Sequence, residues 1–489
     1  MLQYLSLFEC SSWLALTLAR YCRLVPPTRE LQRNSTVAWA SQPASQRHRA
    51  GHAPIPWVAD ALALLAGIGL GIAIALGISS ESPSLLSSPG GWFDAVGRLA
   101  ALTGTYLMLV MIVLIARLPW LERTVGQDRL VRWHRRIGGW PIALIVVHVV
   151  AVTLGYAQMT KSGPFHQFWV FLRNYPDLLA AIVSFALLIV AGVSSARIAR
   201  RRMKYETWWV VHLYMYLALG LAFAHQIVTG VMFLGHPLAR GYWIGVSALT
   251  AGVVLTSRVI LPMIRNARLQ LRVHKVEEEA PGVYTVTLKG RQLSRLAVSG
   301  GQFFQWRFLT KGLWWHSHPY SLSALPRPPY LRVTVKASGD QSSAVGHLRV
   351  GTRVLIEGPY GTFTKHARTN TSVTMVGAGV GITPLRALLE DLPGDIDVSV
   401  IIRASRVEEI VHRDELEALV RARGGTFHEL VGSRHQVVLD ARTMKQLAPR
   451  LAQGDLYICG PEGFTERVVD VARRLGLRKQ QIHYEAFSF

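Results

Sequence analysis

The sequence predicts a multidomain membrane protein: an all-α six-helix transmembrane bundle, then an antiparallel β-barrel domain, then an α/β domain with a parallel sheet. Half of the 489 residues are hydrophobic and 17% are charged, a composition typical of membrane proteins. Six apolar windows long enough to span a bilayer lie before residue 263. Beyond them, segments that alternate apolar and polar residues precede segments in which strands and helices alternate.

We assign no function to residues 1–54, which we expect to be a disordered N-terminal tail. The stretch LSLFECSSWLALTLARY is weakly apolar, but no positively charged segment precedes it and no A-x-A cleavage site follows. A polar stretch poor in bulky apolar residues comes next. The three cysteines, Cys10, Cys22 and Cys459, are too scattered for a disulfide framework or a thiolate metal site.

Residues 55–266 are predicted to form the membrane domain. The six apolar windows cover about residues 57–79, 96–116, 138–157, 178–196, 208–232 and 242–262. The loops after the second and fourth windows are rich in arginine and lysine, whereas the opposite loops carry only Lys161, Arg173 and Arg240. By the positive-inside rule, the basic loops and both termini are cytoplasmic. This distribution largely explains the net charge of +23, so the charge does not indicate nucleic-acid binding.

Two further domains are predicted after Pro262. The segment LQLRVHKVEEEAPGVYTVTLKG alternates apolar and polar residues, and residues 267–368 are expected to form the antiparallel barrel. From NTSVTMVGAGVGITPLRALLEDL onward, strand-like runs alternate with helical ones. Residues 369–489 are therefore expected to form the α/β domain.

Four histidines in the apolar windows form two pairs, His134 with His148 and His212 with His225. The members are 14 and 13 residues apart, which is about 20 Å along a helix. Both helices run outward from the cytoplasm, so His134 and His212 lie near the inner face and His148 and His225 near the outer. Each level-matched pair would supply the two imidazole ligands of a b-type haem.

The phase of the second pair fits this arrangement only in part. A spacing of 13 residues leaves His225 about 140° around an ideal helix from His212. Either the helix is distorted, for example at Gly220, or the ring orientations compensate. The alternative is that the histidines bond to neighbouring helices or form a proton path. Four histidines at matched depths favour haem.

Short motifs in the last two domains have the chemistry of a flavin and nucleotide site. An aromatic–hydroxyl pair such as Tyr320–Ser321 can stack on a flavin ring and bond its edge, and His318 can meet a phosphate. The glycines of VGAGVGITP (Gly377, Gly379 and Gly381) follow a strand and open onto a helix, which lets backbone N–H groups approach a pyrophosphate. The third glycine of the Rossmann fingerprint is missing, so this loop alone is weak evidence.

In this order the motifs resemble those of the ferredoxin–NADP reductase superfamily. Joined to the six spans and four histidines, they resemble the ferric reductase / NADPH oxidase family in its bacterial form, over residues 57–489. The resemblance implies a bacterial plasma membrane location with six spans. It implies a flavin motif (His318, Pro319, Tyr320, Ser321), a second FAD contact (Gly339, Ser342), a nicotinamide-nucleotide loop (Gly377, Gly379, Gly381, Thr383, Pro384), and a C-G-P motif near the nicotinamide (Cys459, Gly460, Pro461).

Two more roles follow from the resemblance. Phe487 is expected to be the aromatic residue that covers the flavin and yields to nicotinamide, with Phe489 as the alternative. Ser405 and Arg406 follow the second strand of the nucleotide domain, where an arginine can bond the 2′-phosphate of NADPH. We therefore prefer NADPH to NADH, although SRVEE is also compatible with the start of a solvated helix.

The implied function is a transmembrane NAD(P)H-dependent flavohaem oxidoreductase. Electrons would pass from cytoplasmic NADPH through FAD and two b-type haems to an acceptor outside the cytoplasm. Val152 stands where animal oxidases of the family place a further histidine, and the first span has no arginine. Ferric chelate and oxygen therefore both stay open as acceptors. The alternatives are an electron donor to a partner membrane or periplasmic protein, and a transporter with the histidines as a proton relay.

Overall fold

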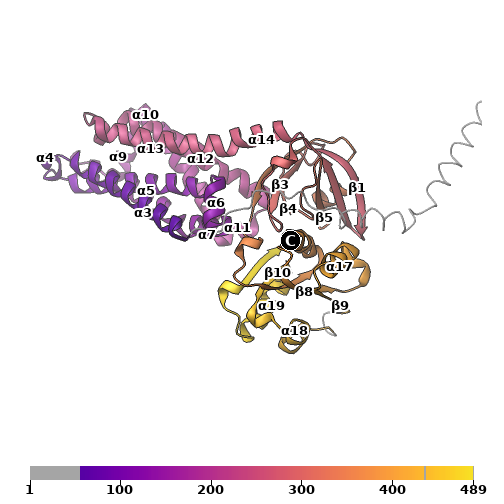
Figure 1. Cartoon of the computed structure of the whole chain (residues 1–489). Helices are drawn as coiled ribbons and strands as arrows, with labels where there is room; N and C mark the ends of the chain where they lie inside the picture. Colours follow the sequence, from indigo (N-terminus) through magenta and orange to yellow (C-terminus); the bar gives the residue numbers. More distant parts are fainter. Residues whose placement is uncertain (1–55, 434–436, 488–489) are drawn as a thin grey trace, which may run out of the picture. The chain divides into compact units, whose positions relative to one another are not determined.

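The computed structural model describes residues 56–433 and 437–487 (Figure 1). These residues divide into two compact units, with the boundary in the sequence between Arg265 and Asn266. The expected N-terminal tail and Phe489 lie outside the described residues. The first unit is helical, and the second contains all the described strands. We describe each unit by itself.

The first unit contains six helices, or runs of helix, that are long and apolar enough to cross a membrane. Its long helices are α3 (Pro56–Ser79), α5 (Gly91–Ile115), α8 (Gly139–Met159), α10 (Pro176–Ser195), α12 (Tyr205–Thr229) and α13 (Pro237–Leu255). Shorter helices lie between them: α4 (Pro83–Leu86), α6 (Pro119–Val125), α7 (Gln127–Ile137), α9 (Pro164–Asn174) and α11 (Arg197–Arg202). Helix α14 (Leu261–Leu269) follows α13 and leads into the second unit. Proline opens several of these helices, because its fixed φ suits the first turn and its missing N–H costs nothing there.

The third predicted span differs from the structure at its cytoplasmic end. Gly138 is a turn residue between α7 and α8 whose φ of −54° and ψ of −27° stay in the helical region, so His134 on α7 and His148 on α8 belong to one helical run, Arg129–Met159, as predicted. The basic segment before this span was expected to be a loop, but it is helical, as α6 and α7. Helix α12 continues through Gly220 without a break.

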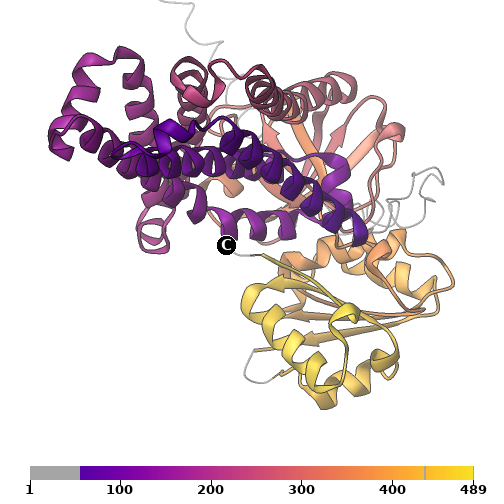
Figure 2. The same ribbon diagram turned by 90° about the vertical axis from the view of Figure 1, so that its left-hand side faces the viewer.

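Glycines bring the helices of this unit close together. Helix α5 packs on α8, and α10 packs on α12. Figure 2 shows the ribbon of the chain from a second side. A Cβ atom on Gly97 of α5 would lie 2.7 Å from Val152 Cγ2 on α8. A Cβ atom on Gly155 would lie 2.9 Å from the Gly90 carbonyl oxygen. Small residues at such contacts are typical of helix packing in membranes, where apolar burial alone does not drive association.

The second unit begins with a lobe of two antiparallel three-stranded sheets. Their strand orders are β1-β2-β5 and β4-β3-β6. The strands are β1 (Arg272–Ala280), β2 (Val283–Lys289), β3 (Phe303–Phe308), β4 (His318–Ser321), β5 (Tyr330–Lys336) and β6 (Val354–Tyr360). Side chains from both sheets, among them Leu288, Trp306 and Val333, form one core. The sequence predicted a barrel, and the structure has two sheets on a shared core.

The remaining lobe contains a five-stranded parallel sheet with order β11-β10-β7-β8-β9. Its strands are β7 (Ser372–Ala378), β8 (Asp397–Ala404), β9 (Thr426–Val431), β10 (Asp455–Pro461) and β11 (Ile482–Phe487). Helices α16 (Ile382–Asp391), α17 (Arg413–Arg421), α18 (Ala441–Leu447) and α19 (Glu462–Arg474) connect them. The chain moves outward from β7 to β9 and then returns to β10 on the other side of β7. Ligands of α/β sheets bind at such a reversal, beyond the carboxyl ends of the strands.

Candidate functional site

The predicted nucleotide loop lies at this reversal. Gly377 belongs to the end of β7, Gly379 has φ +56°, and α16 begins directly after Gly381. A Cβ atom on Gly381 would lie 2.3 Å from the Cys459 carbonyl oxygen of β10, so only glycine fits there. A Cβ atom on Gly379 would meet nothing within 4 Å, which leaves that backbone open to a ligand. This arrangement suits a pyrophosphate at the N-terminus of α16.

Thr383 and Pro384 build this turn and do not present side chains to a ligand. Both residues are buried, and the Thr383 hydroxyl donates to the Val380 carbonyl oxygen at 2.9 Å. Proline near the start of α16 suits the first turn of a helix. Their predicted contribution to the nucleotide site is therefore the shape of the loop.

The C-G-P motif lies beside the loop, at the end of β10. Cys459 pairs with Gly377 of β7, and its side chain is fully buried in the core of the lobe. Burial raises the pKa of the Cys459 thiol, and the Glu485 carboxylate adds to the effect. Cys459 is therefore a neutral, packed thiol at physiological pH, not a reactive thiolate. Pro461 pairs with Phe487 of β11, so the backbone brings the end of the chain to the motif.

Arg406 stands on the surface just beyond β8. Its side chain is 73% exposed, and its Nε donates to Glu409 at 3.2 Å. The neighbouring Ser405 N–H also donates to Glu409, at 3.3 Å. Ser405 and Arg406 thus follow β8, the strand next to β7. Among the described contacts, both residues pair with the Glu409 carboxylate.

The predicted flavin motif is strand β4. Three of its polar atoms are buried and have no hydrogen-bond partner among the described residues: His318 Nε2, Tyr320 Oη and Ser321 Oγ. The rings of His318 and Tyr320 stack with centroids 5.8 Å apart. Burial raises the pKa of Tyr320 to about 12, so its hydroxyl stays a donor. Buried polar groups are normally paired, so this cluster is suited to a polar ligand.

The predicted second FAD contact forms a closed turn. The Ser342 hydroxyl accepts from Ser338 N–H at 2.8 Å and from Gly339 N–H at 3.0 Å. It donates to the Gly339 carbonyl oxygen at 2.9 Å. Next to this turn, the Gln341 amide lies 2.9 Å from His316 Nδ1. This last contact ties the turn to the segment just before β4.

The inner histidines face each other across two helices. The ring centroids of His134 on α7 and His212 on α12 are 6.2 Å apart. An imidazole nitrogen binds a metal ion at about 2 Å, so two imidazoles on opposite sides of one ion have ring centroids about 6 Å apart. Trp208 stacks on His212 at 5.1 Å, and the Arg200 guanidinium lies over Trp208 at 4.7 Å.

The outer histidines line a cavity of about 400 Å³. The residues around it are mainly apolar and include His148, Val152 and His225. Val152 lies in the cavity wall. Both outer histidines therefore face one space that could hold a flat, mostly apolar group.

Each of the four imidazoles is held in the same tautomer. His134 Nδ1 lies 3.2 Å from the Met111 carbonyl oxygen, and His148 Nδ1 lies 2.9 Å from that of Gly97. A carbonyl only accepts, so both Nδ1 atoms carry the proton.

The imidazoles of His225 and His212 contact hydroxyl groups that donate their own protons to backbone carbonyl oxygens. Thr229 Oγ1 donates to the His225 carbonyl oxygen and therefore accepts from His225 Nδ1 at 2.9 Å. Ser195 Oγ donates to the Ala191 carbonyl oxygen and accepts from His212 Nδ1 at 3.3 Å. All four Nε2 atoms thus carry the lone pair that a metal ion needs.

Sequence reasoning missed a charged cluster in the wall of the outer cavity. Arg98 and Asp94 of α5 line the cavity, and Arg98 forms ion pairs with both Asp94 and Glu81. The three side chains are only 4–12% exposed. We examined the first span for an arginine, whereas Arg98 lies on the second. Its spacing of four residues from Asp94 was the available signal.

Three protein-family models match the chain. Residues 100–223 match the ferric reductase like transmembrane component, residues 269–364 an FAD-binding domain, and residues 375–470 the oxidoreductase NAD-binding domain. The chain joins a ferric reductase-like membrane component to FAD- and NAD-binding domains. The resemblance inferred from the sequence is confirmed. The membrane match contains His134, His148 and His212 and ends two residues before His225.

Curated relatives share parts of this arrangement. A flavohemoprotein of Chromobacterium violaceum is 30% identical over 244 residues, which are 44% of this chain and 60% of that protein. Human NADPH oxidase 5 is 23% identical over 58% of this chain and 41% of its own length. Human dual oxidase 1 is 23% identical over 76% of this chain and 25% of its own length. Across three bacterial flavohemoproteins, the chain spans about half of each relative's length.

Proposed function

We propose that the protein is a transmembrane oxidoreductase that passes electrons from cytoplasmic NADPH through FAD and two b-type haems to an acceptor outside the cytoplasm. The observation that carries the proposal is the common tautomer of the four intramembrane histidines, together with the 6.2 Å separation of the inner pair. Flavin accepts two electrons from a nicotinamide, whereas haem iron accepts one at a time. FAD therefore converts the two-electron transfer from NADPH into single-electron transfers to haem.

His134 with His212 would hold the inner haem, and His148 with His225 the outer one. In each case the backbone carbonyl or hydroxyl at Nδ1 orients the ring and increases the basicity of Nε2. A proton path is the competing role, but it does not require all four rings to expose the same nitrogen. The domain assignments follow the same proposal: residues 55–266 for haem, 267–368 for FAD and 369–489 for NAD(P)H.

His318, Tyr320 and Ser321 would hold the flavin, since their orphaned polar atoms fit a polar ring edge and a phosphate. Pro319, Gly339 and Ser342 shape the backbone around it. The loop from Gly377 to Gly381, with Thr383, Pro384 and Gly460, would hold the pyrophosphate of the nucleotide. Arg406 and Ser405 would meet the 2′-phosphate, which favours NADPH, although NADH is not barred from the rest of the site.

Cys459 and Phe487 border the place where nicotinamide would lie. The fully buried Cys459 side chain supports a packing role beneath the nicotinamide, with no acid–base chemistry. Phe487 is the aromatic residue at the end of β11, beside Pro461. We propose that it covers the flavin and moves aside when nicotinamide binds.

The acceptor is a small molecule, either a ferric chelate or oxygen, that approaches the outer cavity. Arg98 supports a small or anionic acceptor by its position in the cavity wall, but Asp94 and Glu81 neutralise much of its charge. Transfer to a partner membrane or periplasmic protein is the alternative. The arginine-rich segments support cytoplasmic termini. The bacterial plasma membrane location follows from the resemblance seen in the sequence.

The purified protein tests the proposal directly. It is reduced anaerobically with NADPH, and its absorption is followed while ferric chelate, oxygen or a candidate partner is added. We expect b-type haem bands on reduction and their loss on reoxidation by the acceptor. Cytochrome c reduction with and without superoxide dismutase separates oxygen from ferric chelate. Absence of b-haem bands after dithionite reduction would contradict the proposal.

A further inference from the structure

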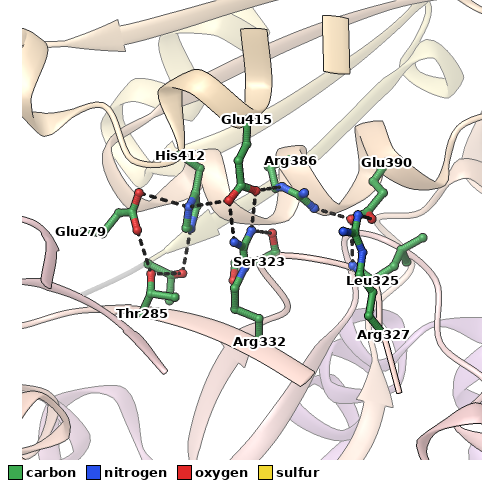
Figure 3. A network of polar contacts seen from close by, with 11 residues as sticks. Glu279, Thr285, Ser323, Leu325, Arg327, Arg332, Arg386, Glu390, His412 and Glu415 are labelled. Atoms are coloured by element: carbon green, nitrogen blue, oxygen red, sulfur yellow. Dashed lines mark hydrogen bonds and ion pairs between the residues drawn. The ribbon is translucent and has the colours of Figure 1, made fainter. Parts of the chain in front are cut away.

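A buried ion network joins the two lobes of the soluble unit (Figure 3). We call it the interlobe network. The Arg332 guanidinium on β5 donates to both carboxylate oxygens of Glu415 on α17, at 2.7 and 2.8 Å. Arg386 on α16 donates from Nε to the same carboxylate at 2.7 Å. These three side chains are at most 3% exposed.

The network extends in both directions from Glu415. On one side His412 lies 2.9 Å from the Thr334 hydroxyl of β5 and 3.3 Å from the Glu279 carboxylate of β1. On the other side Glu390 pairs with Arg386 and, at 2.5 Å, with Arg327. The network thus links β1 and β5 of one lobe to α16 and α17 of the other.

The network contains three carboxylates (Glu279, Glu390 and Glu415), three guanidinium groups (Arg327, Arg332 and Arg386) and the His412 imidazole, which pairs with Glu279. Burial acts to raise the pKa of Glu415, but the Arg332 and Arg386 guanidinium groups outweigh it and hold the pKa at about 2. Removal of one partner from such a buried pair leaves an uncompensated buried charge, which is costly. The buried pair of Arg332 and Glu415 therefore ties the two lobes to one specific contact.

The network also reaches both halves of the candidate site. Arg386 and Glu390 lie on α16, the helix that begins directly after the nucleotide loop. Glu390 accepts from the Leu325 N–H at 3.0 Å, and Leu325 lies four residues after Ser321 of the flavin strand. One helix therefore connects the nucleotide loop to the segment that leaves β4.

Asp391 fixes the same helix at a second point. It accepts from the Gly300 N–H at 3.0 Å and pairs with Lys365 at 2.8 Å, both from the flavin-side lobe. Gly300 packs so closely on α16 that a Cβ atom there would lie 2.2 Å from the Ala387 carbonyl oxygen. Helix α16 is thus held against the flavin lobe over its C-terminal half.

We propose that Arg327 and Glu390 are positioning residues that set the approach of nicotinamide to flavin. The inference rests on the proposed function and deepens it. In the step concerned, one hydride leaves the nicotinamide and bonds to the flavin ring, so two electrons and one proton pass together, NADPH is oxidised and FAD is reduced. A misplacement of about 1 Å in such a step can cost about 10²-fold in rate.

The test uses the full-length detergent-solubilised holoenzyme with the variants Arg327→Ala, Arg327→Lys and Glu390→Gln. Flavin reduction by NADPH is followed in single turnovers, and hydrogen exchange is measured at residues 323–327 and on α16. We expect flavin reduction in Arg327→Ala and Glu390→Gln to be about 10- to 100-fold slower at saturating NADPH. FAD content and the half-saturating NADPH concentration stay close to the parent values, exchange at residues 323–327 accelerates, and Arg327→Lys restores most of the rate.

Arg450→Ala is the matched control. Arg450 also forms an ion pair, with Asp397 at 3.1 Å, but the pair lies within one lobe and is largely exposed. A parental rate in both Arg327→Ala and Glu390→Gln would overturn the inference, as would a loss of rate that only follows loss of FAD. If the parent protein itself does not reduce flavin with NADPH, the proposed function fails instead. The exchange measurement then still decides whether the network couples the lobes.

Discussion

At the scale of single residues, the proposed haem sites depend on the groups that hydrogen-bond to each histidine Nδ1 as much as on the histidines themselves. A histidine in an apolar helix has several uses, and its sequence position does not distinguish them. The partner at Nδ1 does so, because it decides which nitrogen is left to bind a metal ion. Thr229 and Ser195 perform this task for His225 and His212.

The first prediction concerns Thr229. Thr229→Val removes the acceptor at His225 Nδ1 and frees the ring to turn, so haem affinity at the outer site should fall about 10- to 100-fold. Titration of haem into the apoprotein measures this change. Thr153→Val is the control, since Thr153 lines the same cavity but its hydroxyl donates to the Val149 carbonyl oxygen of its own helix. Equal losses in both variants would contradict the prediction.

The second prediction concerns the outer ligands. His148→Ala should leave the protein with one haem in place of two, because the outer site then has a single imidazole. Haem content per chain and the reduced spectrum give the measurement. His166→Ala, at an exposed position of α9, should keep both haems. Full haem content in His148→Ala would favour the proton-path role.

The third prediction concerns Arg406. Arg406→Ala should raise KM for NADPH about tenfold and leave KM for NADH unchanged, because a charge-assisted hydrogen bond contributes about 1.5–3 kcal/mol. Steady-state kinetics with both nucleotides measure the difference. Arg421→Ala removes another exposed arginine, which pairs with Glu417, and should affect neither nucleotide. An equal loss with NADH would remove the case for a 2′-phosphate contact.

At the scale of elements, helix packing and strand pairing bring the candidate site residues together. A single turn residue, Gly138, separates α7 from α8, and His134 on α7 faces His212 on α12. The parallel register of β7 and β10 brings Gly377 beside Cys459. Helix α16 then carries the interlobe network away from the nucleotide loop.

The fourth prediction is a pH dependence of stability at this level. Burial acts to raise the pKa of Glu415, but two guanidinium groups hold it at about 2, below its ordinary value of 4.5. A depressed folded pKa gives stability that is present above pH 4.5 and is lost as the pH falls toward 2. The contribution is about 3 kcal/mol, from about 1.4 kcal/mol per pKa unit. The thermal unfolding midpoint should therefore be lower in Glu415→Gln than in the parent protein at pH 6. Between pH 6 and pH 3 this midpoint should fall less steeply in the variant than in the parent. Parallel curves for both proteins would contradict this account.

At the scale of the whole molecule, membrane orientation decides which side supplies electrons. The arginine-rich segments predict that α9 lies outside the cytoplasm and α11 inside. Both helices expose a large apolar side chain, Phe165 at 94% and Ile198 at 75%. The two positions allow a matched test of orientation.

The fifth prediction uses these positions. In intact cells, an impermeant thiol reagent should label Phe165→Cys but not Ile198→Cys, and permeabilised cells should label both. Both variants are made in a Cys10→Ser, Cys22→Ser background, and the remaining native cysteine, Cys459, is fully buried. The opposite labelling pattern would invert the topology and exclude cytoplasmic NADPH as the donor to this protein.

Much of the architecture was predictable because it depends on local patterns. Spanning length, arginine distribution and strand–helix alternation are read along the chain, and they predicted the six spans and the order of the domains. The glycine loop was predictable because only glycine allows the close approach at Gly381. Arg98 and the interlobe network were not predictable. Only the four-residue spacings of Asp94 from Arg98 and of Arg386 from Glu390 are local signals, and other partners lie far apart in the sequence, by 83 residues for Arg332 and Glu415.

The sequence by itself determined that four histidines lie in apolar helices at two depths, and that flavin and nucleotide motifs follow. These properties depend on residue type and spacing, which the chain carries directly. Only the tertiary structure decided which nitrogen each histidine presents, that Cys459 is packed away, and that α16 is held against the flavin lobe. The physical reason is that hydrogen bonds and burial are set by neighbours in space, which folding brings together from distant parts of the sequence.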